Sequence, residues 1–466
     1  MKKLLPIGLG IVALGLLVAP KMIGTQLDNK LNEIAQSVND MPGYQLNILN
    51  KDDAWFTSSA TLELVLDLDA LSQGQFLGEE WRIPFDFDAV HGPVLLADNA
   101  SFGLVQWQLK AAGESLREHL SWPLDQAFYQ MNAKLGFSSD FDYQDQITAF
   151  SGNDDIEGQF RFSGYEGKAE IKQGILEYHG KAARFEANNQ SGELLVEDLT
   201  MQTQAEVALE TLFDQIFYSG EGKVNLSSFT FQEPDGRQTA ALKDIYMTSE
   251  SKINDESDSV DLAVVYGIKS LQLDDFKGED FKLGLQINNI SQTFFKAYQA
   301  FAPSLVQASG AQSSAMTMSF LEENLLSLVL TEPEINITSL RASLPQGDFE
   351  SYLNTRLTGV TALPSKLDDM GFWLSHTNVD GLIKGDKPVI EQAAKWFVMY
   401  QLQTNPQTLG MGQAQLEQIV NSQVPMLLQG IEYQGFIVKD EDQYSTKLSL
   451  KDKVLTVNAQ TIPLPY

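Results

Sequence analysis

The sequence predicts an α+β protein in which antiparallel β-sheet dominates, preceded by one N-terminal transmembrane helix. Three patterns predict this fold class. An uncharged apolar run opens the chain, alternating apolar and polar residues mark short strands through most of it, and two later segments have apolar residues at helical spacing. Strands that occur in runs, with helical segments kept apart from them, are typical of sheets covered at one face or end by helical hairpins.

Composition excludes several classes of function. The 466 residues include 62 acidic and 32 basic side chains, a formal net charge of −30, and no cysteine. Such a charge repels phosphates and no basic stripe offsets it, so no nucleic-acid partner is expected. The absence of cysteine excludes disulfides, thiolate nucleophiles and Cys-ligated zinc.

Residues 1–21 are expected to form a membrane anchor. Leu4–Pro20 is uncharged and apolar, and Lys2, Lys3 and Lys21 flank it. A cleaved signal peptide is the alternative, but its best cleavage site would leave a proline at the new N-terminus. The positive-inside rule places the N-terminus in the cytoplasm. In a Gram-negative bacterium the chain would then be a single-pass inner-membrane protein with its bulk in the periplasm.

Residues 22–42 are expected to continue as a juxtamembrane helix. Its apolar residues recur at spacings of three and four and form one stripe, made of Ile23, Leu27, Leu31, Ile34 and Val38. We expect the stripe to pack on the exported domain, with a dimerising stalk as the alternative.

Residues 43–285 are expected to form a β-rich periplasmic region. The run ATLELVLDLDA at 60–70 has leucine at every second position from its third residue, a period typical of a half-buried strand. Similar short runs punctuated by glycine predict meandering antiparallel ribbons with one solvated face. Helical patterns interrupt them near 116–135 and 207–217.

Four shorter regions complete the chain: a helical segment at 286–332, a β segment at 333–385, a helical hairpin at 386–430 and a C-terminal β-hairpin at 431–466. In the last of these, alternating residues on either side of a turn at 451–453 predict the two strands. The run KWFVMYQL at 395–402 is rich in large apolar side chains. We expect it to pack in the core, with a docking surface as the alternative.

The search for chemistry leaves one residue to weigh, His91. No two of the four histidines have zinc-site spacing, and neither a nucleophile elbow nor a phosphate-binding loop is present. The acidic clusters lack the calcium-loop pattern. His91 precedes the turn signal Gly92-Pro93, and the sequence pairs it with no nucleophile or carboxylate. A structural turn is therefore favoured, and we expect no catalytic residue, no metal site and no cofactor.

Several short motifs occur in a set order along the chain. After the Lys-flanked anchor come WFTSSA at 55–60, HGP at 91–93, EPEINITSL at 332–340 and LKDKVLTVNAQTIPL at 450–464. In this order they resemble the YdgA/YihF family, bacterial inner-membrane-associated proteins that carry a domain of unknown function, over nearly the whole chain. The resemblance implies a shared, structural signature formed by Trp55, Phe56, Ser58, His91, Gly92 and Pro93.

The chain departs from that family pattern at two places. Asp53-Ala54 stands where family members often have Arg-Gly, and Asn458-Ala459 stands where they often have Asn-Gly. These departures argue against an invariant catalytic role for the residues that differ.

Three functions remain open, because the resemblance implies no known activity. The first is a non-catalytic cell-envelope protein, anchored in the inner membrane, whose periplasmic β-rich domain binds a lipid or another amphipathic ligand. The alternative is a periplasmic scaffold that binds an envelope protein partner during the assembly of an envelope or surface structure. The third is an enzyme of unrecognised type, with His91 as its best candidate residue.

Overall fold

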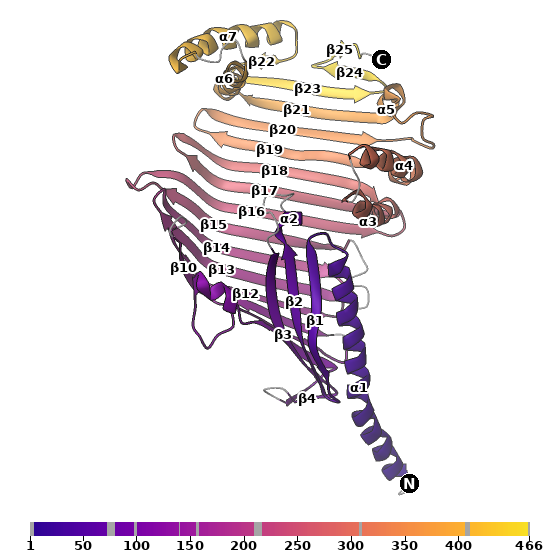
Figure 1. Ribbon diagram of the computed structural model, residues 1–466. Coiled ribbons are helices and arrows are strands. Elements are labelled where there is room, and N and C mark those ends of the chain that lie inside the picture. The colour runs from indigo at the N-terminus through magenta and orange to yellow at the C-terminus, as the bar shows by residue number, and fades with distance from the viewer. Residues whose placement is uncertain are drawn as a thin grey trace. The chain divides into compact units, whose positions relative to one another are not determined.

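The computed structural model divides into two compact units. It describes residues 4–71, 80–96, 100–138, 140–154, 158–208, 217–306, 310–405 and 411–464, and the side chains of the first helix from Ala19 onward. Unit 1 comprises Met1–Val224 and Phe231–Arg237, and unit 2 comprises Asn225–Thr230 and Gln238–Tyr466. Antiparallel β-sheet dominates each unit (Figure 1), as the sequence predicts.

The helices are α1 (Leu4–Asn39), α2 (Leu68–Leu71), the 3₁₀ helix η1 (Glu114–Glu118), α3 (Gln292–Val306), α4 (Gly310–Val329), α5 (Met370–His376), α6 (Lys387–Thr404) and α7 (Gln413–Tyr433). Within the described part of the chain, we find no helix both long enough and apolar enough to cross a membrane. The predicted anchor lies almost wholly outside the described side chains, as do Lys2 and Lys3.

The strands of unit 1 are β1 (Tyr44–Asp53), β2 (Thr57–Asp67), β3 (Glu80–His91), β4 (Val94–Leu96), β5 (Ala100–Phe102), β6 (Val105–Ala111), β7 (Leu120–Ser121), β8 (Tyr129–Leu135), β9 (Phe141–Ile147), β10 (Phe150–Asp154), β11 (Gly158–Phe162), β12 (Tyr165–Lys172), β13 (Ile175–Asn189) and β14 (Gly192–Glu206). They form an antiparallel meander in the order β1–β2–β3–β6–β8–β9–β12–β13–β14. Strand β13 pairs with β12 along the first part of one edge and with β11 further along the same edge.

Helix α1 packs against β1 and β3 through the predicted stripe. Its residues Ile23, Leu27 and Leu31 contact the buried core of unit 1. That core consists of Ala60, Leu62, Phe87, Ala89 and Val105. The predicted packing of the stripe on the sheet is therefore confirmed for its first three residues, whereas Ile34 is exposed. Burial of these side chains, at about 2 kcal/mol each, holds the helix on the sheet.

One predicted helix is wrong. The pattern at 116–135 forms a single 3₁₀ turn, then β7, and then the strand β8. Strand β8 pairs with β6 on one side and β9 on the other, so its backbone hydrogen bonds are made between strands. This tertiary pairing overrides the weak local preference for helix. Most of the other predicted helical stretch, 207–217, lies outside the described residues.

Strand β15 (Gly220–Gln232) contributes residues to both units. The remaining strands of unit 2 are β16 (Gln238–Asn254), β17 (Ser259–Leu273), β18 (Phe276–Ser291), β19 (Glu334–Leu344), β20 (Gly347–Leu357), β21 (Thr377–Asp386), β22 (Val438–Asp440), β23 (Gln443–Lys451), β24 (Val454–Val457) and β25 (Gln460–Ile462). Their antiparallel order is β16–β17–β18–β19–β20–β21–β23–β24–β25, and β22 pairs with β23.

The helices of unit 2 lie at two opposite ends of this sheet (Figure 1). Helices α3 and α4 connect β18 to β19 and contact β18, and α5 precedes β21 at the same end. Helices α6 and α7 follow β21 at the other end and share a core built around Val398, Val420, Val424 and Leu428. Helix α6 also contacts β20, β21 and β23.

Two consecutive two-residue turns close the C-terminal strands. Asp452 and Lys453 join β23 to β24, which confirms the predicted hairpin, and Asn458 and Ala459 join β24 to β25. All four have positive φ, with 47° at Asn458 and 67° at Ala459. Asparagine tolerates this left-handed conformation, but alanine does not favour it. The turn geometry therefore explains why Asn-Gly suits this position.

We expect the substitution Ala459→Gly to stabilise unit 2 by about 0.5–1 kcal/mol, because glycine adopts positive φ without strain. The contrasting variant is Asn458→Gly. The Asn458 side chain accepts from the backbone N–H of Lys447 at 2.7 Å and donates to the carbonyl of Gly435 at 3.0 Å. Losing both bonds should lower stability by about 1 kcal/mol. Calorimetric unfolding of the full-length protein measures both changes, and a lower transition for Ala459→Gly would contradict the account.

Candidate functional site

His91 ends β3 and is buried beneath α1. Its imidazole is 1% exposed, and its Nε2 lies 3.1 Å from the hydroxyl oxygen of Ser58 on β2. A Cβ on Gly24 of α1 would overlap the ring, so glycine is required there for the helix to approach this closely. The peptide bond from Gly92 to Pro93 is cis, and the backbone N–H of His91 donates to the carbonyl of Phe56 at 2.7 Å.

A chain of polar contacts extends from this histidine back to α1. The hydroxyl of Ser58 hydrogen-bonds the carboxylate of Asp53, whose Oδ2 lies 3.1 Å from Nζ of Lys51. Lys51 in turn pairs with Asp28 of α1. Because the hydroxyl proton of Ser58 is donated to Asp53, its oxygen accepts from Nε2–H of His91. The predicted signature residues Ser58 and His91 thus meet in one network that ties the helix to three strands.

Charges and burial set the protonation of this network. Burial lowers the pKa of His91 below its ordinary value, although the carbonyls of Trp55 and Pro20 and the carboxylate of Asp53 favour the protonated ring. Lys21 also faces the ring and lowers its pKa further. Burial raises the pKa of Asp53, but its bonds to Lys51 and Ser58 outweigh this, so the pKa is lowered overall. The geometry is that of a neutral histidine packed in the joint between α1 and the sheet.

The end of unit 1 next to this joint carries exposed apolar side chains, which we call the rim. The rim consists of Met22, Trp55, Phe56, Leu96 and Phe102. Trp55 and Phe56 precede β2 beside His91, while Leu96 and Phe102 lie on the short hairpin β4–β5 that follows Pro93. Leu96 and Phe102 are 72% and 73% exposed. Figure 1 shows β4 at the end of unit 1 from which the N-terminal part of α1 extends.

The sheet of unit 2 presents one apolar face. Three neighbouring rows of side chains cross it at paired positions of β17, β18, β19, β20, β21 and β23. The first row is Tyr266, Leu283, Leu340, Ser351, Ile383 and Thr446; the second is Val264, Leu285, Ile337, Leu353, Gly381 and Leu448; the third is Leu262, Ile287, Ile335, Thr355, Val379 and Leu450. We call these the apolar rows.

Many side chains in the apolar rows are uncovered. Six of them are between 37% and 63% exposed: Tyr266, Leu285, Ile287, Ile335, Leu340 and Ile383. With about 4.8 Å between neighbouring strands, the rows extend roughly 25 Å across the sheet. Large exposed apolar surfaces are unusual in soluble monomers and are typical of ligand-binding or partner-binding sites.

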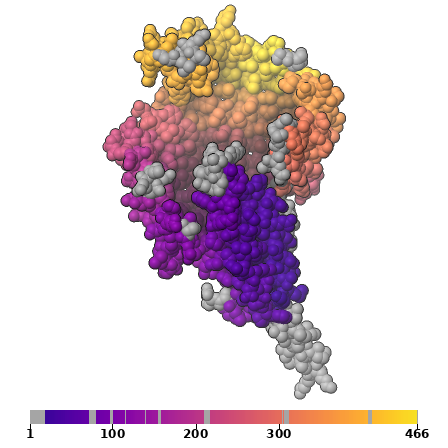
Figure 2. Space-filling view, in the orientation of Figure 1, coloured from indigo at the N-terminus to yellow at the C-terminus, as the bar shows by residue number. Residues whose placement is uncertain are grey.

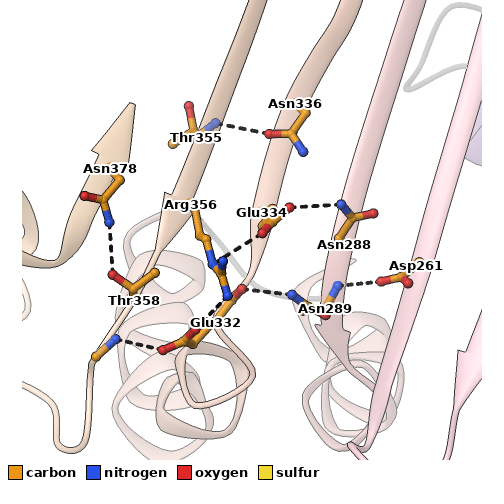
Figure 3. A network of polar contacts seen from close by, with 11 residues as sticks. Asp261, Asn288, Asn289, Glu332, Glu334, Asn336, Thr355, Arg356, Thr358 and Asn378 are labelled. Carbon is orange, nitrogen blue, oxygen red and sulfur yellow. Dashed lines mark hydrogen bonds and ion pairs between the residues drawn. The ribbon is translucent and has the colours of Figure 1, made fainter. Parts of the chain in front are cut away.

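The opposite face of the same sheet is polar, and one network of hydrogen bonds and ion pairs connects its strands (Figure 3). Asn288 donates to Glu334 at 3.0 Å, and Arg356 bridges Glu334 and Glu332 at 3.3 and 2.9 Å. Asn289 joins the network through the carbonyl of Glu332. The EPEINITSL segment thus supplies the polar contacts that hold β18, β19 and β20 in register.

The helical hairpin α6–α7 forms an outer surface of unit 2 (Figure 2). The expectation that KWFVMYQL packs in the core holds for Val398 but is wrong for its aromatic residues. Trp396, Phe397 and Tyr400 are each more than half exposed, although the Trp396 ring lies 5.9 Å from that of Phe276 on β18. Helix α6 packs on α7 through a narrow apolar stripe, and its aromatic side chains lie outside this stripe.

Sequence reasoning located the His91 joint but missed the apolar rows. Alternation predicts that each strand has an apolar side, but the exposure of that side depends on what packs against it. The chain matches the family described as "Bacterial protein of unknown function (DUF945)" over residues 1–465, and it belongs to that family. Comparisons with curated proteins and with solved structures gave no significant match.

The buried neutral histidine predicts a pH-dependent stability. Because the folded-state pKa of His91 is lower than its ordinary value of 6.5, the unfolded chain takes up the proton first as the pH falls. The neutral His91 ring therefore contributes its full stabilisation of the folded state above pH 6.5. This stabilisation is lost as the pH falls through the folded-state pKa of His91. We expect the melting temperature of the full-length protein to fall between about pH 7.5 and pH 5, and part of that fall to be missing in His91→Asn.

The matched control is His179→Asn, since His179 is exposed on β13. It should reproduce the wild-type dependence of melting temperature on pH. His91→Asn should also unfold more readily at pH 7.5, by about 1–3 kcal/mol, because it leaves a cavity beneath Gly24. Identical pH dependence in His91→Asn and the wild type would contradict the assignment.

Proposed function

We propose that this protein is a non-catalytic component of the cell envelope that binds the acyl chain of a lipid or another amphipathic ligand along the apolar rows of unit 2. We further propose that residues 1–21 anchor it in the inner membrane of a Gram-negative bacterium, with the bulk of the chain in the periplasm. Within its family, we propose that it is one of the YdgA/YihF proteins, because it has the same short motifs in the same order.

The exposed apolar rows carry the proposal. Covering about 400 Å² of apolar surface contributes roughly 10 kcal/mol at 25 cal/mol per Å². Ordering and immobilising a flexible ligand offsets much of this free energy, and the remainder is enough for measurable binding. One leaflet of a bilayer gives an acyl chain about 15 Å of depth, half of a hydrocarbon core of about 30 Å. The rows are long enough to receive such a chain lying across the strands.

The charge of the protein is compatible with this ligand. A net charge of −30 disfavours contact with an anionic headgroup, but the apolar rows contact only the hydrocarbon. The carboxylates of the network in Figure 3 lie on the other face of the sheet. Alternation along each strand separates the two surfaces, so an acyl chain can bind without passing the charged groups.

The rim supports the proposed anchor. Tryptophan favours the interface between water and lipid because its ring is apolar and its indole N–H is polar, and phenylalanine and leucine side chains can insert into the same layer. Trp55, Phe56, Leu96 and Phe102 surround the end of unit 1 from which α1 extends toward its apolar run. A rim of this composition would rest in the outer headgroup layer when Leu4–Pro20 spans the membrane.

Lipid content tests the binding proposal. Full-length protein is purified from membranes in mild detergent, and bound lipid is quantified by mass spectrometry. We expect a reproducible lipid in the wild type and at least about tenfold less in Ile335→Asn, because one polar amide interrupts the third apolar row. The control Gln286→Glu alters the polar face of β18 and should retain the lipid.

A folded wild-type protein without lipid would refute the binding proposal. It would favour the alternative, a scaffold that binds an envelope protein partner. The exposed Trp396, Phe397 and Tyr400 of α6 are the observation behind that alternative, since aromatic residues are enriched where proteins bind one another.

Membrane attachment is tested separately. We expect the full-length protein to stay in the membrane pellet at alkaline pH, because a spanning apolar helix resists extraction that removes peripheral proteins. Replacing residues 1–21 with a cleavable export signal should release a folded protein into the soluble periplasm. Recovery of the unaltered protein in the soluble fraction would contradict the proposed anchor. The variant is the folding control, because its release into the soluble periplasm shows that the rest of the chain folds without residues 1–21.

A further inference from the structure

Unit 1 contains a second polar cluster on the mainly apolar face of its sheet. We call it the Tyr–Asp cluster. It consists of Tyr129 on β8, Tyr143 and Asp145 on β9, Tyr165 on β12 and Tyr178 on β13. Pairing between these four adjacent strands places all five side chains on the face that also carries the core beneath α1. A carboxyl group and four phenols at this position need an explanation beyond packing.

Two facing glycines bring these groups together. Gly167 on β12 pairs directly with Gly180 on β13. A Cβ on Gly167 would overlap Oδ1 of Asp145, and it would lie 2.8 Å from the hydroxyl of Tyr178 and 2.9 Å from that of Tyr165. A Cβ on Gly180 would lie 2.6 and 2.9 Å from the hydroxyls of Tyr165 and Tyr178. The missing side chains therefore let one carboxylate oxygen and two hydroxyls converge over the same patch of backbone.

The carboxyl group in this cluster lacks a counter-charge. Among the described residues, Oδ1 of Asp145 is buried and has no hydrogen-bond partner. Burial raises the pKa of Asp145, and only a bond from Tyr143 and its own backbone N–H oppose this; no described Lys or Arg contributes. Burial also raises the pKa of Tyr129, Tyr143 and Tyr178, so these three phenols stay neutral. A neutral or negative ligand would gain little from such a site, whereas a cation would neutralise the carboxylate.

The chemistry of the donors decides which cation fits. Calcium and magnesium take six or more oxygens from several carboxylates, but this cluster has one carboxylate. No group of three or more metal-ligating side chains occurs among the described residues. An ammonium group suits a carboxylate flanked by tyrosine hydroxyls, because the carboxylate neutralises its charge and the hydroxyl oxygens accept its N–H bonds.

We propose that Asp145, together with Tyr129, Tyr143, Tyr165 and Tyr178, forms a binding site for an ammonium group. The site lies wholly within unit 1, so it does not depend on acyl-chain binding by the apolar rows of unit 2. The ammonium can belong to the headgroup of a phospholipid such as phosphatidylethanolamine, or to a free small amine.

Titration of the full-length protein in detergent tests this site. Ethanolamine and choline are the free probes, observed by saturation-transfer NMR, and lipid binding is followed by native mass spectrometry with equal amounts of phosphatidylethanolamine and phosphatidylglycerol. We expect at least tenfold weaker binding of the ammonium probe to Asp145→Asn. The control Asp142→Asn removes an exposed carboxylate from the other face of the same strand and should bind as the wild type does.

Two further measurements keep the result interpretable. Tyr178→Phe keeps the ring and removes one hydroxyl, so it should weaken binding by a smaller factor even if Asp145→Asn fails to fold. Binding by the wild type should strengthen as the pH rises and Asp145 ionises. Binding of the free amines identifies a small-amine site, and binding of phosphatidylethanolamine alone identifies a headgroup site; either supports an ammonium site.

Two outcomes would overturn the proposal: equal binding of the ammonium probe by the wild type and a folded Asp145→Asn, or the absence of binding to every ammonium probe. Neither outcome bears on lipid bound by unit 2, which Ile335→Asn tests separately. Loss of lipid in Ile335→Asn with retained amine binding would show that the two sites are independent.

Discussion

Strand register is the constraint on which the rest of this structure depends. Side chains alternate between the two faces of a strand, so a slip of one residue in β18 would place Gln286 and Asn288 among the apolar rows. The polar network around Glu332 and Arg356 opposes such a slip, because its bonds are made only in the observed register. Short turns also fix the register. Leu344 at the end of β19 pairs with Gly347 at the start of β20.

A second constraint joins the helix to the sheet in unit 1. Gly24 lets α1 approach His91, and the contacts from His91 through Ser58, Asp53 and Lys51 to Asp28 fix the helix above β1, β2 and β3. The same residues lie beside the rim, next to the end of α1 that leads to the proposed anchor.

Sequence patterns predicted the elements whose signals are local. The stripe on α1 is read from residues three and four apart, and the C-terminal hairpin from alternation on both sides of one turn. The helix predicted at 116–135 fails because β8 makes its bonds to β9, which follows it, and to β6, which lies about twenty residues earlier in the chain. The aromatic side of α6 was assigned to the core because composition does not reveal which side of a helix finds a partner.

The candidate sites were harder to predict for the same reason. His91 and Ser58 lie 33 residues apart, and their contact follows from the pairing of β2 with β3. The Tyr–Asp cluster draws on four strands, with glycines whose purpose is visible only when the strands are paired. The apolar rows differ from a buried core only in exposure, which no single strand encodes.

Photo-crosslinking in living cells tests the central claim, that the apolar rows hold lipid, most directly. A photoreactive amino acid replaces Leu285 in one strain and Gln286 in another, so the two probes occupy neighbouring positions on opposite faces of β18. The account predicts that illumination joins a lipid to the protein at position 285 and not at 286. Equal labelling at both positions, or none at 285 when the protein is folded and located correctly, would contradict it.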